Sequence, residues 1–428
     1  MPGSGGQTLD ERLTRALRSA VDLRPGEARP LLLAAGYFFF VLASYYILRP
    51  LREEMGVAGG VDNLAWLFTG SLVTMLALHA PFAALVARLP RRRFVALTNR
   101  FFLANLLLFF VALRLLPPGA GVWAGRVYFV WTSVFNLFVV SVFWAVMVDV
   151  FDAGQGRRLF GFIALGGTLG GITGAGLTAA LARPLGPVYL LLCSAALLEL
   201  GVRCVLRLTR EPRSRGARPE GDPEAPIGGS VAGGVAHVVR SPYLLGICGY
   251  MMLFTLGSTV LYFHQARLAE ATFTDSALRT AFFARLDLVV NLLTALGQMF
   301  ATGRLLTRLG VALTMTLLPA LSLAGFLLLG VAPVLGVFVT FQVLRRAAEY
   351  AVAKPTRELL YTVITREDKY KAKNFIDTFV YRAGDQIAAW SYTGLLAAGL
   401  GMAAVSFVMA PVAAVWLVLA LWLGRRQA

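Results

Sequence analysis

Charged residues, cysteine and histidine are all scarce in this 428-residue sequence. Only 15% of its residues are charged and 57% are hydrophobic, with a mean hydropathy of +0.69, which indicates an integral membrane protein. The cysteines Cys193, Cys204 and Cys248 all lie inside apolar segments, so neither disulfides nor a zinc site is expected. The three histidines lack metal-ligand spacing, and the sequence contains no G-x-x-x-x-G-K-[ST] motif and no nucleophile–base pair. These absences argue against an ATP-hydrolysing pump, a metal hydrolase or another enzyme, and we expect no metal and no cofactor.

Apolar runs long enough to cross a membrane recur along the chain. A hydrocarbon layer of about 30 Å needs roughly 18 to 25 apolar residues in a helix. We predict twelve spans, at 31–48, 64–87, 95–116, 123–150, 159–181, 188–206, 243–265, 278–302, 311–330, 331–353, 374–398 and 401–424. The first thirty residues have no short apolar centre of their own, and no obvious cleavage site follows the first span, so that span should remain in the mature protein.

The net charge of +17 follows this topology. Most lysines and arginines fall in both termini and in the connections on one side of the predicted spans, which the positive-inside rule places in the cytoplasm. The basic loops therefore predict contact with anionic membrane lipids and no nucleic-acid partner.

A segment rich in proline, glycine and charge, Thr209 to Ser230, divides the spans six and six. Such a segment cannot build a core and indicates a flexible linker. We expect a cytoplasmic segment at 1–30, six-helix bundles at 31–207 and 241–428, a linker at 208–240, and a monomer. Two six-helix halves joined in this way are the plan of the major facilitator fold, whose substrate site lies between the halves. The stretches ARLPRRRFVALT and GRLLTRLGVALT, after the second and eighth spans, support an internal repeat.

The fifth span is unusually rich in glycine. Small residues let helices approach closely, and here they explain either helices that rock against each other or tight packing in a static bundle. The glycines are Gly161, Gly166, Gly167, Gly170, Gly171, Gly174 and Gly176.

Charges inside the spans are the best clues to a site. Each costs ~2.5–3.5 kcal/mol at the membrane centre unless it faces a partner or a watery cavity. Tyr45, Arg49 and Arg52 share one helical face at the end of the first span. They predict an anion-binding site, with Glu53 and Glu54 holding the arginines in place through salt bridges. Snorkelling of the arginines to the interface is the alternative.

The eighth span carries a polar stripe spaced at i, i+4, i+7 and i+11: Asp287, Asn291, Thr294 and Gln298. Lipid excludes such a stripe, so it faces the bundle interior. There it either lines a substrate cavity or forms only interhelical hydrogen bonds. Arg285 is expected to pair with Asp287 or to face substrate.

The end of the fourth span carries another charged group. We expect Asp149 and the nearby Asp152 to pair with Arg157 and Arg158 in a salt-bridge cluster at the cytoplasmic mouth.

A further group surrounds the connection between the tenth and eleventh spans, where Pro355 is predicted to end the tenth helix. Its acids and bases predict a gate of salt bridges, with a binding role as the alternative. The gate residues are Arg345, Arg346, Glu349, Arg357, Glu358, Lys373 and Asp377. We assign Arg382 and Asp385, further along the chain, to the substrate site.

Two stretches carry a family resemblance: ILRPLREEMG at the end of the first span, and KPTRELLYTVITREDKYKAKNFID over Lys354 to Asp377. Together they resemble the ATP/ADP translocase family of nucleotide transporters of plastids and intracellular bacteria. Arg49 matches a family arginine, and Arg52 stands at a lysine implicated in substrate binding. Phe143 and Trp144 agree more weakly. The second pattern is carried by Thr356, Arg357, Glu358, Tyr361, Lys369, Lys371, Lys373, Ile376 and Asp377.

The sequence also departs from the family pattern. Thr132 replaces a glutamate, Asp385 replaces a second functional lysine, and Asp287 and Val290 replace an asparagine and a glutamate. The resemblance therefore implies a divergent bacterial relative in the inner membrane, and these departures bear on which substrate it carries.

These observations predict a secondary transporter that moves a phosphorylated anion, a nucleotide in ATP/ADP-type exchange, by alternating access. Arg49 and Arg52 would bind phosphate through bidentate hydrogen bonds, and Asp287, Asn291 and Gln298 would contact base or ribose. Exchange follows if the empty carrier must reorient with its arginines lacking counter-charges in a desolvated cavity.

Two alternatives stay open. A proton-coupled carrier of another solute would use Asp287, Asp377 or Asp385 as the protonatable group. A membrane-embedded lipid-handling or regulatory protein would not transport at all.

Overall fold

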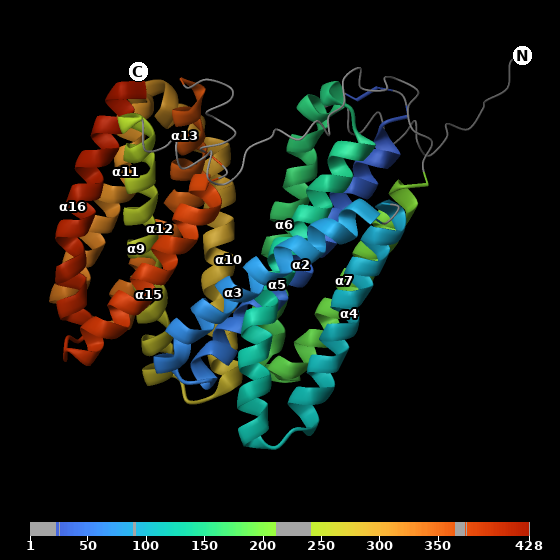
Figure 1. The fold of residues 1–428 in the computed structure, drawn as a ribbon, viewed down its shortest axis with the longest axis horizontal. Helices are drawn as coiled ribbons and strands as arrows, with labels where there is room; N and C mark the ends of the chain where they lie inside the picture. Colours follow the sequence, from blue (N-terminus) through green and yellow to red (C-terminus); the bar gives the residue numbers. More distant parts are fainter. Residues whose placement is uncertain are drawn as a thin grey trace, which may run out of the picture. The chain divides into compact units, whose positions relative to one another are not determined.

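The computed structural model describes residues 23, 24, 26–88, 91–210, 241–363, 373 and 375–427. The predicted linker beyond residue 210, most of the N-terminal segment, and Lys369 and Lys371 lie outside these residues. Throughout the part that is described, the chain is built from helices joined by short connections (Figure 1).

Ten helices of the described chain are long and apolar enough to cross a membrane. They are α2 (Ala28–Ala58), α3 (Leu64–Arg88), α4 (Arg91–Leu115), α5 (Pro118–Val150), α6 (Ala153–Leu185), α7 (Leu190–Leu208), α9 (Pro242–Thr272), α10 (Ser276–Phe300), α11 (Thr302–Val331) and α16 (Met402–Gln427). Short 3₁₀ turns, η1 (Val61–Asn63) and η2 (Pro187–Tyr189), precede α3 and α7.

The tenth and eleventh predicted spans are helical but interrupted. The tenth consists of α12 (Leu335–Ala348), the π-helical turn η3 (Glu349–Ala353) and α13 (Lys354–Leu359), followed by the 3₁₀ turn η4 (Leu360–Thr362). The eleventh consists of the π-helical turn η5 (Ile376–Val380) and α15 (Tyr381–Ala397). With these two, the described chain contains the twelve helical spans that the sequence predicts.

Two predicted details of the spans are wrong. Pro355 does not end the tenth helix, because the wider π turn before it lets the helix continue into α13, where proline occupies the first turn. The ninth span is longer than predicted, since α11 already begins at Thr302. Its first turns are set off by a kink at Gly310, whose φ of 69° is a backbone conformation that glycine adopts without strain.

The chain forms two compact units. The first contains Met1–Ala58, Val73–Glu220 and Asp275–Leu288, and the second contains Gly59–Leu72, Gly221–Thr274 and Val289–Ala428. In the first unit α2 packs against α5, α6 and α7; in the second α11 packs along α16, and α9 packs against α15 and α16.

Glycines bring α2 and α6 into backbone contact. A Cβ on Gly166, Gly170 or Gly174 would overlap the carbonyl of Ala35, Phe39 or Ala43, so three successive turns of α6 lie directly on α2. Both helices belong to the first unit. The glycine-rich span therefore packs tightly within one bundle, which is the second of the two explanations given for its glycines. It also fixes the helix that carries Arg49 and Arg52.

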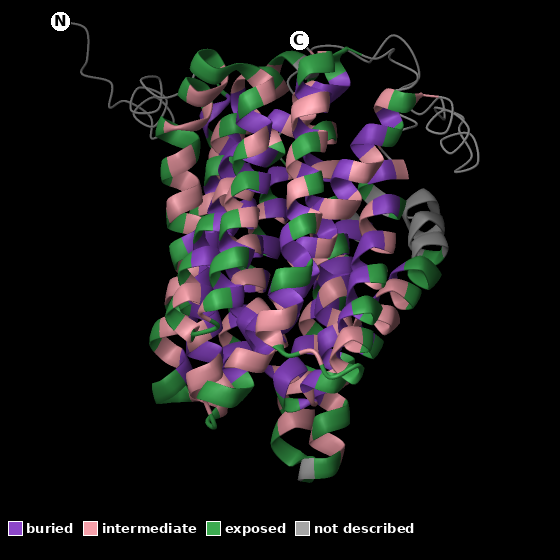
Figure 2. Cartoon of the chain, turned by 90° about the vertical axis from the view of Figure 1, so that its left-hand side faces the viewer, coloured by how far each residue is buried: buried purple, intermediate pink, exposed green. Residues whose placement is uncertain are grey.

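The outward surfaces of the helices are apolar. On α16, Ala413, Trp416 and Ala420 are buried, whereas Val415 and Val418 are 59% and 67% exposed. Figure 2 shows exposed and half-buried residues along the outer faces of the helices and buried residues behind them. Apolar side chains on the outer face are what lipid requires.

Candidate functional site

The arginine pair predicted from the sequence lies in the last turns of α2, inside the first unit. Arg49 and Arg52 are partly buried, with side chains 21% and 18% exposed. Tyr45, one turn earlier, packs against the hydrophobic core of this unit. Both guanidiniums therefore lie within the bundle, where a charge needs compensation.

Arg52 is held by α5 and by its neighbour in sequence. Its Nη1 donates to Glu53 Oε1 at 3.0 Å, and its Nε donates to the Phe129 carbonyl at 3.3 Å. The guanidinium also stacks over the Phe129 ring, with 3.8 Å from Cζ to the ring centroid. Glu53 thus holds Arg52 as predicted. The departure position Thr132 is fully buried beside this contact and donates to the Tyr128 carbonyl.

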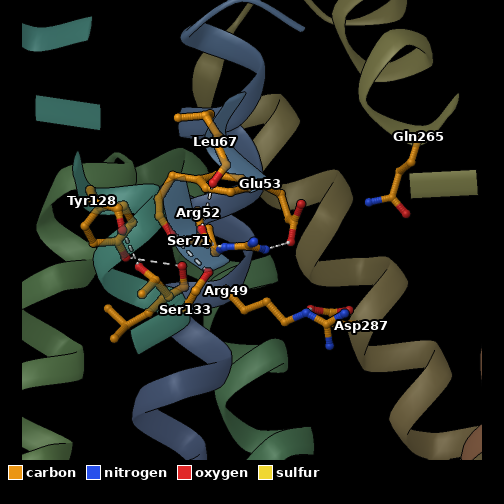
Figure 3. Close-up of polar contacts among 12 residues, drawn as sticks. Arg49, Arg52, Glu53, Leu67, Ser71, Tyr128, Ser133, Gln265 and Asp287 are labelled. Carbon is orange, nitrogen blue, oxygen red and sulfur yellow. Dashed lines mark hydrogen bonds and ion pairs between the residues drawn. The ribbon is translucent and has the colours of Figure 1, made fainter. Parts of the chain in front are cut away.

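Arg49 faces a carboxylate from the second half of the sequence. Its Nε lies 3.6 Å from Oδ2 of Asp287, whose side chain is 4% exposed (Figure 3). The pairing of Asp287 with Arg285 that the sequence allowed is wrong, because Arg285 is exposed on another face of α10. Asp287, the first residue of the predicted polar stripe, therefore neutralises Arg49, which was predicted to bind an anion.

Glu54 does not hold either of these arginines, which corrects the prediction. Its carboxylate accepts two hydrogen bonds from Arg279, at 2.5 Å from Nε and 2.9 Å from Nη2. The Glu54 side chain is only 1% exposed, and paired geometry of this kind is the strongest form of such an ion pair. The first turns of α10 are therefore fixed to the end of α2 at two points, Glu54–Arg279 and Arg49–Asp287.

The rest of the polar stripe belongs to the second unit. The Asn291 amide nitrogen and the Thr294 hydroxyl are buried and make no hydrogen bond among the described residues. Neither side chain forms the interhelical hydrogen bond that was the alternative to lining a cavity.

Gln298 has a structural partner that the sequence did not reveal. Pro355 has no N–H, so one helical donor is missing: the donor that would serve the Tyr350 carbonyl in a π register or the Ala351 carbonyl in an α register. Gln298 Nε2 donates to the Tyr350 carbonyl at 3.2 Å, and Thr302 Oγ1 donates to the Ala351 carbonyl at 2.7 Å. These side chains supply a donor to each of the two carbonyls that the missing N–H could affect.

Arg345, predicted to form a gate salt bridge, is a buried hydrogen-bonding centre instead. It is 1% exposed and donates to Ser322 Oγ at 3.0 Å, to Ser258 Oγ at 3.1 Å and to the Phe254 carbonyl at 3.3 Å. No carboxylate lies within ion-pair distance of it in the described part of the chain. Glu349 follows one turn further along the chain, and Arg346 is also buried.

Asp385 is buried in the second unit, 8% exposed, and accepts a hydrogen bond from Thr259 Oγ1 at 3.0 Å. Arg382, one turn earlier on α15, lies 3.8 Å from its other oxygen. The two residues assigned to the substrate site from the sequence are thus neighbours.

The described residues of the predicted gate around Pro355 include one of the expected ion pairs. Lys373 forms an ion pair with Glu358. Arg357 approaches the Met251 sulfur instead of an acid, and its Nε has no hydrogen bond among the described atoms. Asp377 is exposed.

At the other predicted salt-bridge cluster, Arg158 pairs with Glu27, a partner that the sequence did not predict. Arg158 donates to both Glu27 oxygens at 2.9 and 3.1 Å, and Gln155 donates a third hydrogen bond. Burial raises the pKa of the Glu27 carboxyl, but these hydrogen bonds and one from the Arg24 N–H outweigh it and lower the pKa to about 2.

Of the two predicted aspartate partners, Asp152 has a different role. Asp152 caps α6 in a capping box with Gln155, which removes it from the cluster. Asp149 is half-buried near the end of α5, and Arg157 is exposed.

Arg279 and Glu27 were missed by the sequence analysis. Arg279 lies at the start of the eighth predicted span, and Glu27 precedes the first. The signal that could have found them is charge balance: Glu54 and Arg158 each need a partner of opposite sign that their own helix does not supply.

No protein-family model matches the sequence, and no curated protein matches it. Solved structures match over nearly the whole chain. An auto-inhibited POT family peptide transporter is 16% identical, with 93% of this chain and 96% of that chain covered and a TM-score of 0.62. The nucleoside transporter NupG is 13% identical, with coverage of 92% and 97% and a TM-score of 0.57. The human organic anion transporter MFSD10 is 18% identical, with coverage of 93% and 100% and a TM-score of 0.55.

At these identities the likeness defines the fold. The chain is a multi-pass membrane protein with the major facilitator fold, which confirms the predicted fold class. The resemblance to ATP/ADP translocases finds no counterpart among these matches and stays a hypothesis about function.

Proposed function

We propose that this protein is a secondary transporter that carries a phosphorylated anion, a nucleotide of the ATP/ADP type, across a bacterial inner membrane by alternating access. It would act as a monomer with both termini in the cytoplasm. The observation that carries the proposal is the pair Arg49 and Arg52: two guanidiniums one turn apart, partly buried within a membrane-spanning helix. Guanidinium groups bind phosphate oxygens bidentately and stay charged at every physiological pH.

Other features of the chain support an interior polar site. The buried amide of Asn291 and hydroxyl of Thr294, which lack hydrogen bonds among the described residues, offer groups that a base or ribose satisfies. Because Gln298 is engaged by the Tyr350 carbonyl, we now assign it a structural role. The fold is shared with a nucleoside transporter and an organic anion transporter, so it accommodates solutes of this chemistry.

The charge arrangement bears on the mode of transport. The empty carrier does not reorient with bare arginines, because Asp287 and Glu53 already neutralise Arg49 and Arg52. The penalty on empty crossings is therefore smaller than the sequence alone suggests. We propose exchange that is faster than net uptake, with net uptake still measurable.

The test is uptake of labelled ATP and ADP into proteoliposomes that contain unlabelled nucleotide, beside vesicles left empty. We expect rapid uptake into loaded vesicles and slower uptake into empty ones. Arg49→Ala and Arg52→Ala should abolish uptake. Arg203→Ala, which removes an exposed arginine of α7, should leave it unchanged. Folded protein that takes up no nucleotide in either set would contradict the proposal.

Buried carboxylates support a second candidate, a proton-coupled carrier. Asp287 and Asp385 are 3% and 8% exposed in spans of the bundle, and intramembrane carboxylates often relay protons. Uptake that follows an imposed pH gradient and ignores internal nucleotide would favour this candidate.

A further inference from the structure

The ion pair between Arg49 and Asp287 differs in kind from the other pairs at the end of α2. Its Nε–Oδ2 distance of 3.6 Å exceeds hydrogen-bond length. The Glu54–Arg279 pair beside it is doubly hydrogen-bonded at 2.5 and 2.9 Å. Attraction between charges without a hydrogen bond is weaker and less directional, so the Arg49–Asp287 pair is the easier of the two pairs to separate.

Asp287 also stands where an incoming anion must go. A phosphate group that bound Arg49 would come close to the Asp287 carboxylate. The Asp287 side chain is only 4% exposed, so water does not screen this approach. Two anions side by side in a desolvated place repel strongly, and one guanidinium does not compensate both.

We propose that Asp287 is an internal competitor: its carboxylate occupies Arg49 in the empty protein, and the anionic group of the substrate displaces it. This inference rests on the proposed function and deepens it. It also reverses the role given to Asp287 from the sequence, where the residue contacts base or ribose.

Displacement has a mechanical consequence because Asp287 belongs to α10. Two ion pairs fix the segment 275–288 to α2, and Ala281 shares a buried apolar cluster with Ile47 of α2. When substrate replaces Asp287, the Arg49–Asp287 pair is lost and the Glu54–Arg279 pair stays. Substrate binding thereby loosens α10 from α2. The Arg52–Glu53 pair has no such effect, since its two residues are neighbours on one helix.

The two roles of Asp287 predict opposite results for Asp287→Asn. A substrate contact would weaken binding when its charge is removed, whereas a competitor would strengthen it. We expect the full-length variant in detergent to bind ATP and inorganic pyrophosphate about 10-fold more tightly than the unchanged protein, by isothermal titration calorimetry at fixed ionic strength. A similar gain for both probes locates the competition at the phosphate groups.

Three controls make the result specific. Asp287→Ser removes the same charge and should show the same gain if the asparagine variant does not fold. Asp62→Asn removes an exposed acid that pairs with Arg267, so it should change nothing. In an Arg49→Ala background, the gain from Asp287→Asn should disappear, since there is no longer an arginine to compete for.

The outcomes separate this inference from the proposed function. Binding that depends on Arg49 but is weakened or unchanged by both Asp287 variants would overturn the competitor role and leave the anion carrier standing. Folded protein that binds neither probe, with or without Asp287, would overturn both.

Discussion

Removing one partner of the Glu54–Arg279 pair should destabilise the protein far more than its place at a helix end suggests. The pair is buried, with side chains 1% and 13% exposed, and doubly hydrogen-bonded. Glu54→Ala leaves a guanidinium without its counter-charge, and Arg279→Ala leaves a carboxylate that is almost fully shielded from water. A truncation of this kind costs about 3–5 kcal/mol.

The double variant should lose much less than the two single variants together, because it leaves no unmatched charge. We expect a coupling free energy of about 2–3 kcal/mol from the double-mutant cycle. The chain supplies a matched control in Asp62–Arg267, which has the same ion-pair chemistry but side chains 86% and 34% exposed. An exposed pair of this kind contributes under about 1 kcal/mol.

The measurement is equilibrium unfolding of the purified protein in mixed micelles, with increasing mole fraction of denaturing detergent and tryptophan fluorescence as the signal. Both cycles are run under the same conditions. Additive losses at Glu54 and Arg279, or equal coupling in the two cycles, would show that burial and geometry do not make the first pair special.

Three further perturbations follow from single contacts. Gly170→Ala should destabilise the first unit by about 1–3 kcal/mol, because the new Cβ meets a backbone carbonyl of α2. Gly161→Ala should not destabilise it, because the space around Gly161 is open. Equal effects of the two variants on thermal unfolding would contradict this. Thr302→Val should lower the free energy of unfolding by about 1–3 kcal/mol, because it removes the hydroxyl that donates to the Ala351 carbonyl. Adding Pro355→Ala should recover part of this stability by restoring an N–H. No recovery would refute the proposed link between Thr302 and Pro355. Because the pKa of Glu27 is lowered from 4.5 to about 2, Glu27 should contribute about 2 kcal/mol to the free energy of unfolding after allowing for solvent screening. This contribution should be complete above pH 4.5 and fade toward pH 2. Glu27→Gln should lack it at every pH, and an unchanged pH profile of unfolding in this variant would count against the hydrogen-bonded carboxylate.

Much of the fold follows from local features of the sequence. A membrane span is set by a continuous apolar run, so the twelve spans could be located without knowing what each helix touches. Close packing was also predictable from the sequence, at Gly166, Gly170 and Gly174. A glycine has no Cβ, so another helix can approach it closely whichever helix that is. The interruption at Pro355 was visible too, but its result was not: whether a proline ends or reshapes a helix depends on whether Gln298 and Thr302 can supply donors to the carbonyls that the missing N–H could affect.

The sequence by itself determined the inventory of the site: two guanidiniums at Arg49 and Arg52, a stripe starting at Asp287, and the requirement that each buried charge has a partner. Only the tertiary structure decided the partners. Glu54 belongs to Arg279 and not to its neighbours on α2, and Asp287 belongs to Arg49, far away in the chain. The physical reason is that helical periodicity fixes which face a charge lies on, whereas a salt bridge between helices depends on the packing that brings two faces to within a few ångströms.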